Sequence, residues 1–346
     1  ERKLKMEKLL TVVIPSYNVE KYLNQTLESF VIDSQWLEKL EILIVDDGSK
    51  DHTADIGKEY EHRYPGIFHV ISKENGGHGS TINRGIQEAK GKYFKVVDGD
   101  DWVDSNGFQN FVKMLERCDT DFVIANYYEV NDQSKEKTEK TFPQLEEDKK
   151  MNLEEVITKI QIPMHALTIK TDILKTNKIK LDEHCFYVDV EYVLYPIPYV
   201  KDVTYINEFV YMYRLAVATQ SVSMAGYQKH MQNHIDVVLH LAKYLSLYMK
   251  KQENQTENAE RIAYMRTRIA QMARDQVNIF MSFPVDEKGI KEKFIEFDRE
   301  LKKINPSVYE ETGSYSGMLR MLRKLNFKAY RFVMSISKKR NQTSEE

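Results

Sequence analysis

Cysteine is rare in this chain, which has two in 346 residues, Cys118 and Cys185. Neither residue forms part of a CxxC pair or of a cluster of cysteines and histidines. The sequence therefore argues against a zinc site and a disulfide framework, and a reducing compartment suits it. Long apolar runs are missing too, because the longest run falls far short of the roughly 20 residues that cross a bilayer.

The charge balance of the chain is close to neutral. A formal net charge of −3 provides no general attraction to nucleic acid, and we expect no nucleic-acid partner. With 42% hydrophobic and 30% charged residues, the composition is that of a globular chain long enough for one large domain or two. Residues 1–5 lack the apolar core of a secretory signal, so we expect a cytoplasmic location.

The first hundred residues alternate between strand-like and helix-like patterns. A continuous apolar run, typical of a strand buried on both faces, occurs at 9–14, and further strands are predicted at 40–45, 68–71 and 93–97. This alternation predicts an α/β fold with a mostly parallel sheet flanked by helices. Ligands of parallel sheets bind beyond the carboxyl ends of the strands. The polar turns at these ends are at residues 15–17, 46–47, 75–79 and 98–101.

The turn after the fourth strand is the most unusual of these. Asp98, Asp100 and Asp101 fall within four positions, with Gly99 between the first two. Carboxylates so close repel one another by roughly 1 kcal/mol per pair, and a cation would remove that repulsion. Their hard oxygen atoms suit Mg²⁺ or Mn²⁺. Taken alone, the pattern fits an acidic turn without a ligand equally well.

The remainder of the chain changes character once. The polar stretch at 131–150 is expected to form an exposed hairpin or insertion, and two short strands are expected at 203–206 and 209–214. Beyond Gly226 the periodicity is helical, without a strand pattern. We therefore expect a catalytic-type α/β domain over residues 1–226 and an all-α C-terminal domain over 227–346.

The end of the chain is basic and amphipathic. Apolar and basic residues interleave over 315–340, and no acidic residue occurs from Thr312 through Gln342. A helix of this kind can lie on an anionic membrane surface, at about 1 kcal/mol for each basic residue near it. The alternative is a helix docked on its own domain with a solvated basic face. The first alternative would place the chain peripherally at the inner face of the cell membrane.

Four motifs together carry a family resemblance. They are IPSYN at 14–18, VDDGSKD at 45–51, NGG at 75–77 with Asn83 and Gly85, and DGDD at 98–101. In this order they resemble a family 2 inverting glycosyltransferase of the GT-A type, strongly over 9–130 and more weakly up to 223. The resemblance implies a Rossmann-like fold, a nucleotide-sugar donor, a divalent metal (Mn²⁺ or Mg²⁺) and inversion at the anomeric carbon. The chemistry agrees, because a metal on the diphosphate would stabilise the charge that grows as the glycosidic bond breaks.

The resemblance also implies roles for single residues. Asp100 is the expected metal ligand, and Asp98 would reach the same metal or the ribose hydroxyls. Asp101 and Trp102 would face the donor sugar or the acceptor. Asp47 can accept a hydrogen bond from the uracil imide, which favours a UDP-sugar. The donor-nucleotide residues implied in this way are Pro15, Ser16, Tyr17, Asp47, Asn75, Gly77, Asp98 and Arg214.

An inverting displacement needs a base to accept the proton of the acceptor hydroxyl. The family places an Asp there, in a Glu-Asp pair before a helix, and Asp189 matches it with Val188 in place of the Glu. Glu191 and Asp182 are the reserve candidates, and an ordinary helix cap is the alternative to a catalytic role. The histidines near these motifs are expected to be structural, with the one nearest Asp189 the most open to another role; they are His78, His165 and His184.

The combined interpretation is a metal-dependent glycosyltransferase of the hexosyltransferase type. It would move a sugar from a UDP-sugar to a glycan, glycolipid or glycoprotein acceptor in surface polysaccharide or glycoconjugate synthesis. A sugar nucleotidyltransferase is a second candidate, but it needs a loop rich in Gly and Arg or Lys after the first strand, which residues 15–19 lack. An inactive donor-binding scaffold is the third candidate, and Val188 leaves it open.

Overall fold

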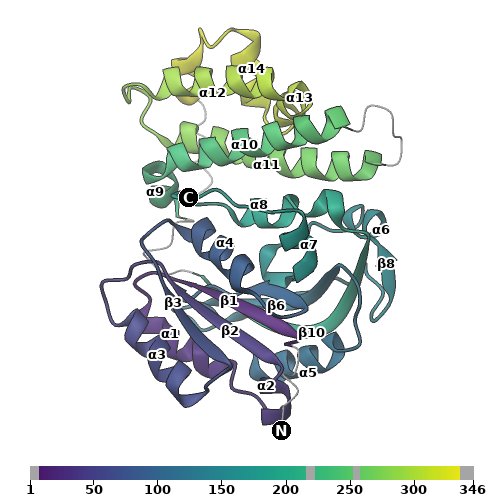
Figure 1. Ribbon diagram of the computed structural model, residues 1–346. Coiled ribbons are helices and arrows are strands. Elements are labelled where there is room, and N and C mark those ends of the chain that lie inside the picture. The colour runs from purple at the N-terminus through teal and green to yellow at the C-terminus, as the bar shows by residue number, and fades with distance from the viewer. Residues whose placement is uncertain (1–7, 216–222, 252–257, 336–346) are drawn as a thin grey trace. The chain divides into compact units, whose positions relative to one another are not determined.

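The computed structural model describes residues 8–215, 223–251 and 258–335. It divides into two compact units, residues 1–217 and 218–346 (Figure 1). Among the described residues, the strands belong to the first unit and the second unit is helical. The α/β class and the helical C-terminal region expected from the sequence are thereby confirmed.

The first half of the sheet is parallel. Strand β1 (Leu10–Ser16) pairs in parallel with β2 (Leu40–Asp46) and with β4 (Tyr93–Val96), and β2 pairs in parallel with β3 (Phe68–Ser72). The carboxyl ends of β1, β2 and β4 are tied together by backbone hydrogen bonds, Asp47 N–H to the Ser16 carbonyl at 2.8 Å and Gly99 N–H to the Pro15 carbonyl at 3.0 Å. The turns predicted to share one edge of the sheet therefore do so.

The second half makes the ten-stranded sheet mixed. The strand β9 (Leu167–Lys170) lies antiparallel between β4 and β6 (Phe122–Asn131), and β10 (Asp202–Leu215) runs parallel to β6. The expectation of two short strands near 203–214 is wrong, because β10 continues through register shifts near Phe209 that keep it paired with β6. Antiparallel short strands complete the sheet, namely β5 (Trp102–Val103), β7 (Lys137–Lys140) and β8 (Lys150–Asn152).

The pairing of β7 with β6 confirms the hairpin expected within 131–150.

Helices cover both faces of the sheet, and the side chains of β1 are therefore buried on both faces (Figure 1). On one face Val12 and Ile14 share a core with Leu27 and Phe108 of the helices below. On the other face α4 approaches closely at Gly85, where a Cβ would lie 2.3 Å from a Val13 methyl carbon. The helices of this unit are α1 (Glu20–Ser29), α2 (Ser34–Leu37), α3 (Thr53–Arg63), α4 (His78–Glu88), α5 (Ser105–Leu115), α6 (Leu153–Ile157), α7 (Thr171–Thr176) and α8 (Asp189–Leu194).

The second unit packs around an aromatic core. The rings of Phe280 and Phe294 stack with centroids 4.7 Å apart, and Phe327 meets Phe294 edge to face. No helix within the described ranges is both long enough and apolar enough to span a bilayer. The helices of this unit are α9 (Met224–Lys229), α10 (Met231–Lys251), α11 (Ala259–Ser282), α12 (Ile290–Ile304), α13 (Pro306–Ser314) and α14 (Gly317–Lys324).

A lysine is buried in the centre of the sheet. Lys95 on β4 has 0% exposure, and its Nζ donates hydrogen bonds to the carbonyl oxygens of His165 at 2.8 Å and Leu167 at 3.2 Å. Burial lowers the pKa of Lys95 from 10.5 to about 7. Because the folded protein then binds fewer protons than the unfolded chain between these values, its stability should rise with pH across this range.

Replacement of Lys95 by Met should remove that pH dependence. From pH 7.5 to pH 9 we expect wild type to gain stability relative to Lys95→Met by about 1.4 kcal/mol per pH unit. Urea unfolding of both proteins at the two pH values measures the difference, and Lys58→Met on exposed α3 is the control. Equal pH slopes for wild type and Lys95→Met would show that the lysine is not held at a lowered pKa.

Candidate active site

The acidic turn after β4 is anchored by Asp101. This residue is 2% exposed, and its carboxylate accepts hydrogen bonds from the Tyr211 hydroxyl at 2.6 Å and the Arg214 backbone N–H at 2.7 Å. Burial and the adjacent Asp100 raise the pKa of Asp101 well above its usual range. Both oxygens are thus engaged by β10, and the structure gives Asp101 an anchoring position in place of the expected contact with a sugar.

Arg214 lies beneath the same turn. Its guanidinium stacks between the rings of Tyr22 and Trp102, with centroids at 4.6 and 4.5 Å, and its Nε donates to the Asp100 carbonyl at 2.6 Å. The side chain is 5% exposed. Its other nitrogens bond to Asp132 and Gln25. Because every arm of the guanidinium is engaged below the turn, the expected contact of Arg214 with a diphosphate finds no support in this geometry.

Trp102 has a second environment besides Arg214. It lines a cavity of about 420 Å³ together with Glu28 of α1, Asp104 and Met212 of β10. Met212 and Arg214 share one face of β10, whereas Tyr211 and Tyr213 occupy the other. The role of Trp102 at the acceptor stays a prediction.

Asp98 and Asp100 are the partly exposed carboxylates of the turn. Burial alone would raise the pKa of Asp98, but the His78 imidazole, with Nε2 at 2.7 Å from Asp98 Oδ1, holds it below its usual value. Burial and the charge of Asp98 raise the pKa of Asp100 to about 6. Two neighbouring carboxylates that repel each other in this way fit a hard divalent cation such as Mn²⁺ or Mg²⁺.

Asp47 at the end of β2 orders the loop before α4. Its carboxylate accepts hydrogen bonds from the backbone N–H groups of Gly76 at 2.9 Å and Gly77 at 2.8 Å, and from Lys73 Nζ at 2.6 Å. The Asn75 amide donates to the Asp47 carbonyl at 3.0 Å. Asp47 is 2% exposed, and both of its carboxylate oxygens are thus bound to the loop before α4. The uracil contact of Asp47 stays a prediction.

Residues 15–17, at the end of β1 and just after it, differ in exposure. Pro15 and Ser16 are buried, and the Ser16 hydroxyl donates to the Ile14 carbonyl at 3.1 Å. Tyr17 is 48% exposed, at the edge where β1, β2 and β4 end. Of the three residues predicted to flank the base, Tyr17 is thus the one with a ring available for stacking.

The glycines of the loop at 74–79 are required by another protein segment. A Cβ at Gly79 would lie 2.0 Å from the Asp182 carbonyl oxygen, and one at Gly77 would lie 3.2 Å from the His184 nitrogen. The His184 N–H also donates to the Gly76 carbonyl at 2.5 Å. The close backbone approach that we expected toward a donor therefore serves, in this structure, the packing of residues 181–185.

Asn83 fixes that segment from the side of α4. Its amide nitrogen donates to the Leu181 carbonyl at 2.9 Å, and its amide oxygen accepts from the Leu181 N–H at 2.8 Å. The segment then leads into α8, whose first residue is the exposed Asp189. Val188, where the family carries Glu, is 0% exposed and packs in the core. The position that differs from the family motif, Val188, is thus a core residue, and the aspartate of the motif is present beside it as Asp189.

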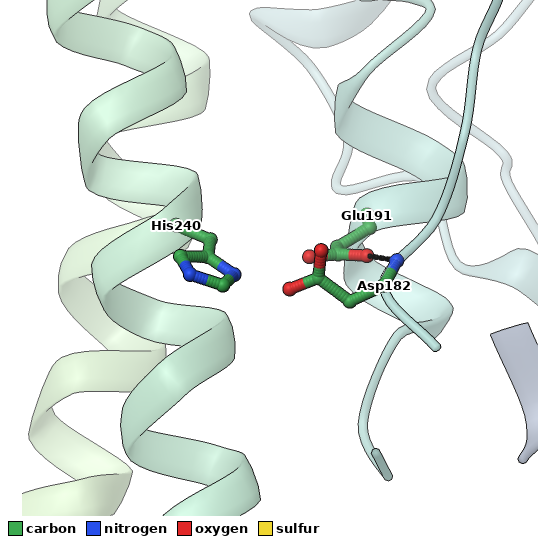
Figure 2. Close-up of side chains that lie close together, drawn as sticks. All are labelled: Asp182, Glu191 and His240. Atoms are coloured by element: carbon green, nitrogen blue, oxygen red, sulfur yellow. Dashed lines mark hydrogen bonds between the residues drawn. The ribbon is translucent and has the colours of Figure 1, made fainter. Parts of the chain in front are cut away.

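Glu191 supports the same segment. Its Oε2 accepts from the Asp182 backbone N–H at 2.8 Å (Figure 2), and its Oε1 accepts from the Tyr195 hydroxyl at 2.9 Å. Burial raises the pKa of Glu191 to about 7. Because both oxygens bond to groups nearby in the chain, Glu191 is suited to holding residues 182–191 together, and Asp189 is the more accessible candidate base.

His78 lies at the site, although the sequence predicted only a structural role for it. It is the first residue of α4, it bonds to Asp98, and the charges of Asp98, Asp189 and Asp100 raise its pKa although burial opposes them. Its place directly after a glycine-containing loop at a strand end could have identified it. His165, by contrast, stacks on Tyr213 at 4.0 Å, and burial lowers its pKa to about 4, as suits a structural residue.

Part of this chain is similar in sequence to known proteins. Residues 11–175 match the family model Glycosyl transferase family 2. The uncharacterized glycosyltransferase EpsJ of Bacillus subtilis is 33% identical over 153 residues, which cover 44% of this chain and 43% of EpsJ. The minor teichoic acid biosynthesis protein GgaB of the same species is 30% identical over 183 residues, 51% of this chain and 19% of GgaB. The chain spans less than half the length of both relatives.

A solved structure shares the fold. S. aureus TarS 1–349, in complex with UDP-GlcNAc, has a TM-score of 0.63 and 18% identity, with 96% of this chain and 92% of that chain covered. At this identity the likeness concerns the fold alone, which is of the GT-A type. Residues 11–175, which match the Glycosyl transferase family 2 model, include the motifs at the carboxyl ends of β1, β2 and β4.

Proposed function

We propose that this protein is a metal-dependent, inverting glycosyltransferase that uses a UDP-sugar. The observation that carries the proposal is the pair Asp98 and Asp100, which lie partly exposed at the carboxyl edge of the sheet. The charges of both, together with that of Asp189, act on the His78 side chain. Family membership supports the reaction class. TarS, which shares the fold, was solved with UDP and with UDP-GlcNAc, and this favours a uridine donor.

The acceptor is proposed to be a glycan, glycolipid or glycoprotein of the cell surface. The teichoic acid role in the name of GgaB favours surface polysaccharide synthesis. Asp100 and Asp98 would hold the divalent metal, which supplies charge stabilisation to the departing diphosphate. Arg214 and Tyr211 keep the turn in place from below. Asp189 would take the proton of the acceptor hydroxyl while the oxygen attacks the anomeric carbon from the opposite side.

Release of UDP from a panel of UDP-sugars tests this proposal. With Mn²⁺ present, one donor should be hydrolysed or transferred faster than the others, and chelation of the metal should abolish the release. Binding of UDP without turnover on water or on any acceptor would favour the inactive scaffold. Formation of UDP-sugar from a sugar phosphate and UTP would favour the nucleotidyltransferase.

We further propose that the C-terminal segment binds an anionic membrane surface, at the cytoplasmic face. The structure sorts its apolar residues into two sets. One set is buried against its own unit, including Leu319, Leu322, Phe327 and Tyr330. The other set is exposed, with Tyr315 at 40%, Met321 at 37%, Leu325 at 42% and Phe332 at 63%. Residues 336–340 of the predicted segment lie outside the described residues.

Basic side chains surround the exposed set. Arg320, Lys324 and Lys328 are exposed, and Arg331 is exposed in an ion pair with Asp286 at 3.2 Å. Apolar and cationic groups side by side match the chemistry of an anionic lipid surface, where both contribute to binding. The docked alternative from the sequence therefore accounts for the buried apolar residues, and a membrane surface would account for the exposed ones.

Vesicle sedimentation tests this surface. We expect the full chain to pellet with vesicles that contain phosphatidylglycerol, to pellet less in high salt, and to pellet at least several-fold less after Phe332→Ser with Leu325→Ser. Leu247→Ser on α10, 51% exposed, is the matched control. Equal pelleting with neutral vesicles, or equal pelleting by the double variant, would contradict the proposal.

A further inference from the structure

His78 has a contact that no role assigned so far explains. Its Nε2 lies 2.7 Å from Asp98 Oδ1, and the two side chains are 28% and 25% exposed. In the part of the chain that the structure describes, this imidazole is the side chain that bonds to the Asp98 carboxylate. An ionised carboxylate only accepts hydrogen bonds, so Nε2 is the donor.

The backbone that carries His78 is held tightly. The loop before it is fixed by the bonds from Gly76 and Gly77 to Asp47, and Gly77 has a φ of +82° with residues 184 and 185 packed against it. The Thr81 hydroxyl donates to the His78 carbonyl at 2.6 Å within the first turn of α4. The imidazole therefore projects from a rigid support, as an orienting group must.

Asp98 is held from the other side as well. Its backbone N–H donates to the Tyr211 hydroxyl at 3.2 Å, and that hydroxyl bonds to Asp101. The backbone of Asp98 is thus placed by β10, but the direction of its carboxylate depends on His78. With Oδ1 engaged by the imidazole, Oδ2 is the oxygen left for an incoming ligand.

We propose that His78 is a positioning residue that orients Asp98 for the metal and the donor. The inference rests on the proposed function, and it restricts Asp98 to a single free oxygen. Asp98 then binds its ligand through one oxygen only, and Asp100 provides the other carboxylate. Outer hydrogen-bond partners of metal-binding carboxylates typically change metal affinity or activity by 10- to 100-fold.

Two substitutions separate orientation from mere packing. Gln can place an amide N–H near the position of Nε2, so His78→Gln should keep the bond to Asp98, whereas His78→Phe keeps the ring volume without a donor. His62→Gln, at an exposed position on α3, is the matched control. Thermal unfolding of each variant establishes that it is folded before binding is measured.

Calorimetric titration with UDP, in the presence and absence of Mn²⁺, provides the measurement. We expect His78→Phe to lose roughly tenfold or more of the UDP affinity that depends on Mn²⁺ and to keep its affinity without metal. His78→Gln should retain most of the Mn²⁺-dependent affinity. Wild-type affinity in His78→Phe would overturn the inference, and so would an equal loss in both variants or a loss of metal-free affinity.

The same titration distinguishes a failure of this inference from a failure of the proposed function. If wild type does not bind UDP with Mn²⁺, the proposed function is wrong and the inference falls with it. If wild type binds and His78→Phe binds equally well, only the role of His78 is wrong.

Discussion

Asp100→Asn is expected to lower UDP-sugar turnover by about 10³-fold or more, because it removes the carboxylate that we assign to the metal. The variant should remain folded. In the structure, burial and Asp98 raise the pKa of Asp100 to about 6, so its charge is unfavourable to the fold when no cation is bound. Loss of that charge should leave the thermal stability of the metal-free protein equal or higher.

Two measurements check this result. Initial rates of UDP release compare the variant with wild type over a range of Mn²⁺ concentrations, and thermal unfolding with and without Mn²⁺ reports metal binding directly. Wild type should be stabilised by the metal, and the variant should not. Asp55→Asn, at a surface position on α3, is the control. A variant that keeps both its activity and its stabilisation by Mn²⁺ would show that the metal lies elsewhere.

Asp189→Asn is expected to reduce sugar transfer by about 10²- to 10⁴-fold while UDP affinity stays unchanged. The range is that of a general base, since an amide cannot accept the proton of the acceptor hydroxyl. Asp189 is exposed at the start of α8. Rates of transfer and calorimetric UDP affinity together make the test.

Glu191→Gln serves as the comparison in the same helix. The Glu191 carboxylate bonds to the Asp182 backbone and to Tyr195, so its loss should lower stability more than it lowers the rate constant of transfer. If Glu191→Gln instead abolishes transfer in a folded protein and Asp189→Asn does not, the assignment of the base must be exchanged between them.

The parallel half of the sheet was predictable because its physics is local. A strand buried on both faces needs a mostly apolar run, and β1, β2 and β4 each have one, interrupted by Glu41 in β2 and by Lys95 in β4. Polar residues at the ends of these runs then had to share an edge. The second half was less predictable, because β5 has 2 residues and β8 has 3, too few to show a period.

Arg214 and the loop at 74–79 show where local reasoning ends. An arginine is usually exposed, and nothing near Arg214 in sequence indicates that Tyr22 and Trp102 enclose it. The glycines of the loop suggested a ligand, but their neighbours are residues about a hundred positions later in the chain. His78 was predicted to be only structural for the same reason, since its partner Asp98 is 20 positions away.

The packing of residues 181–185 on the loop at 74–79 has a consequence for building hybrid enzymes. The two segments meet backbone to backbone, with Gly79 facing Asp182 and Asn83 bonded to Leu181 in both directions. A segment transplanted from a relative should therefore be accepted only as a matched pair, 74–83 together with 181–189. Shuffling libraries that cut between them would yield mostly misfolded chains, and libraries that keep the pair intact would exchange both segments together.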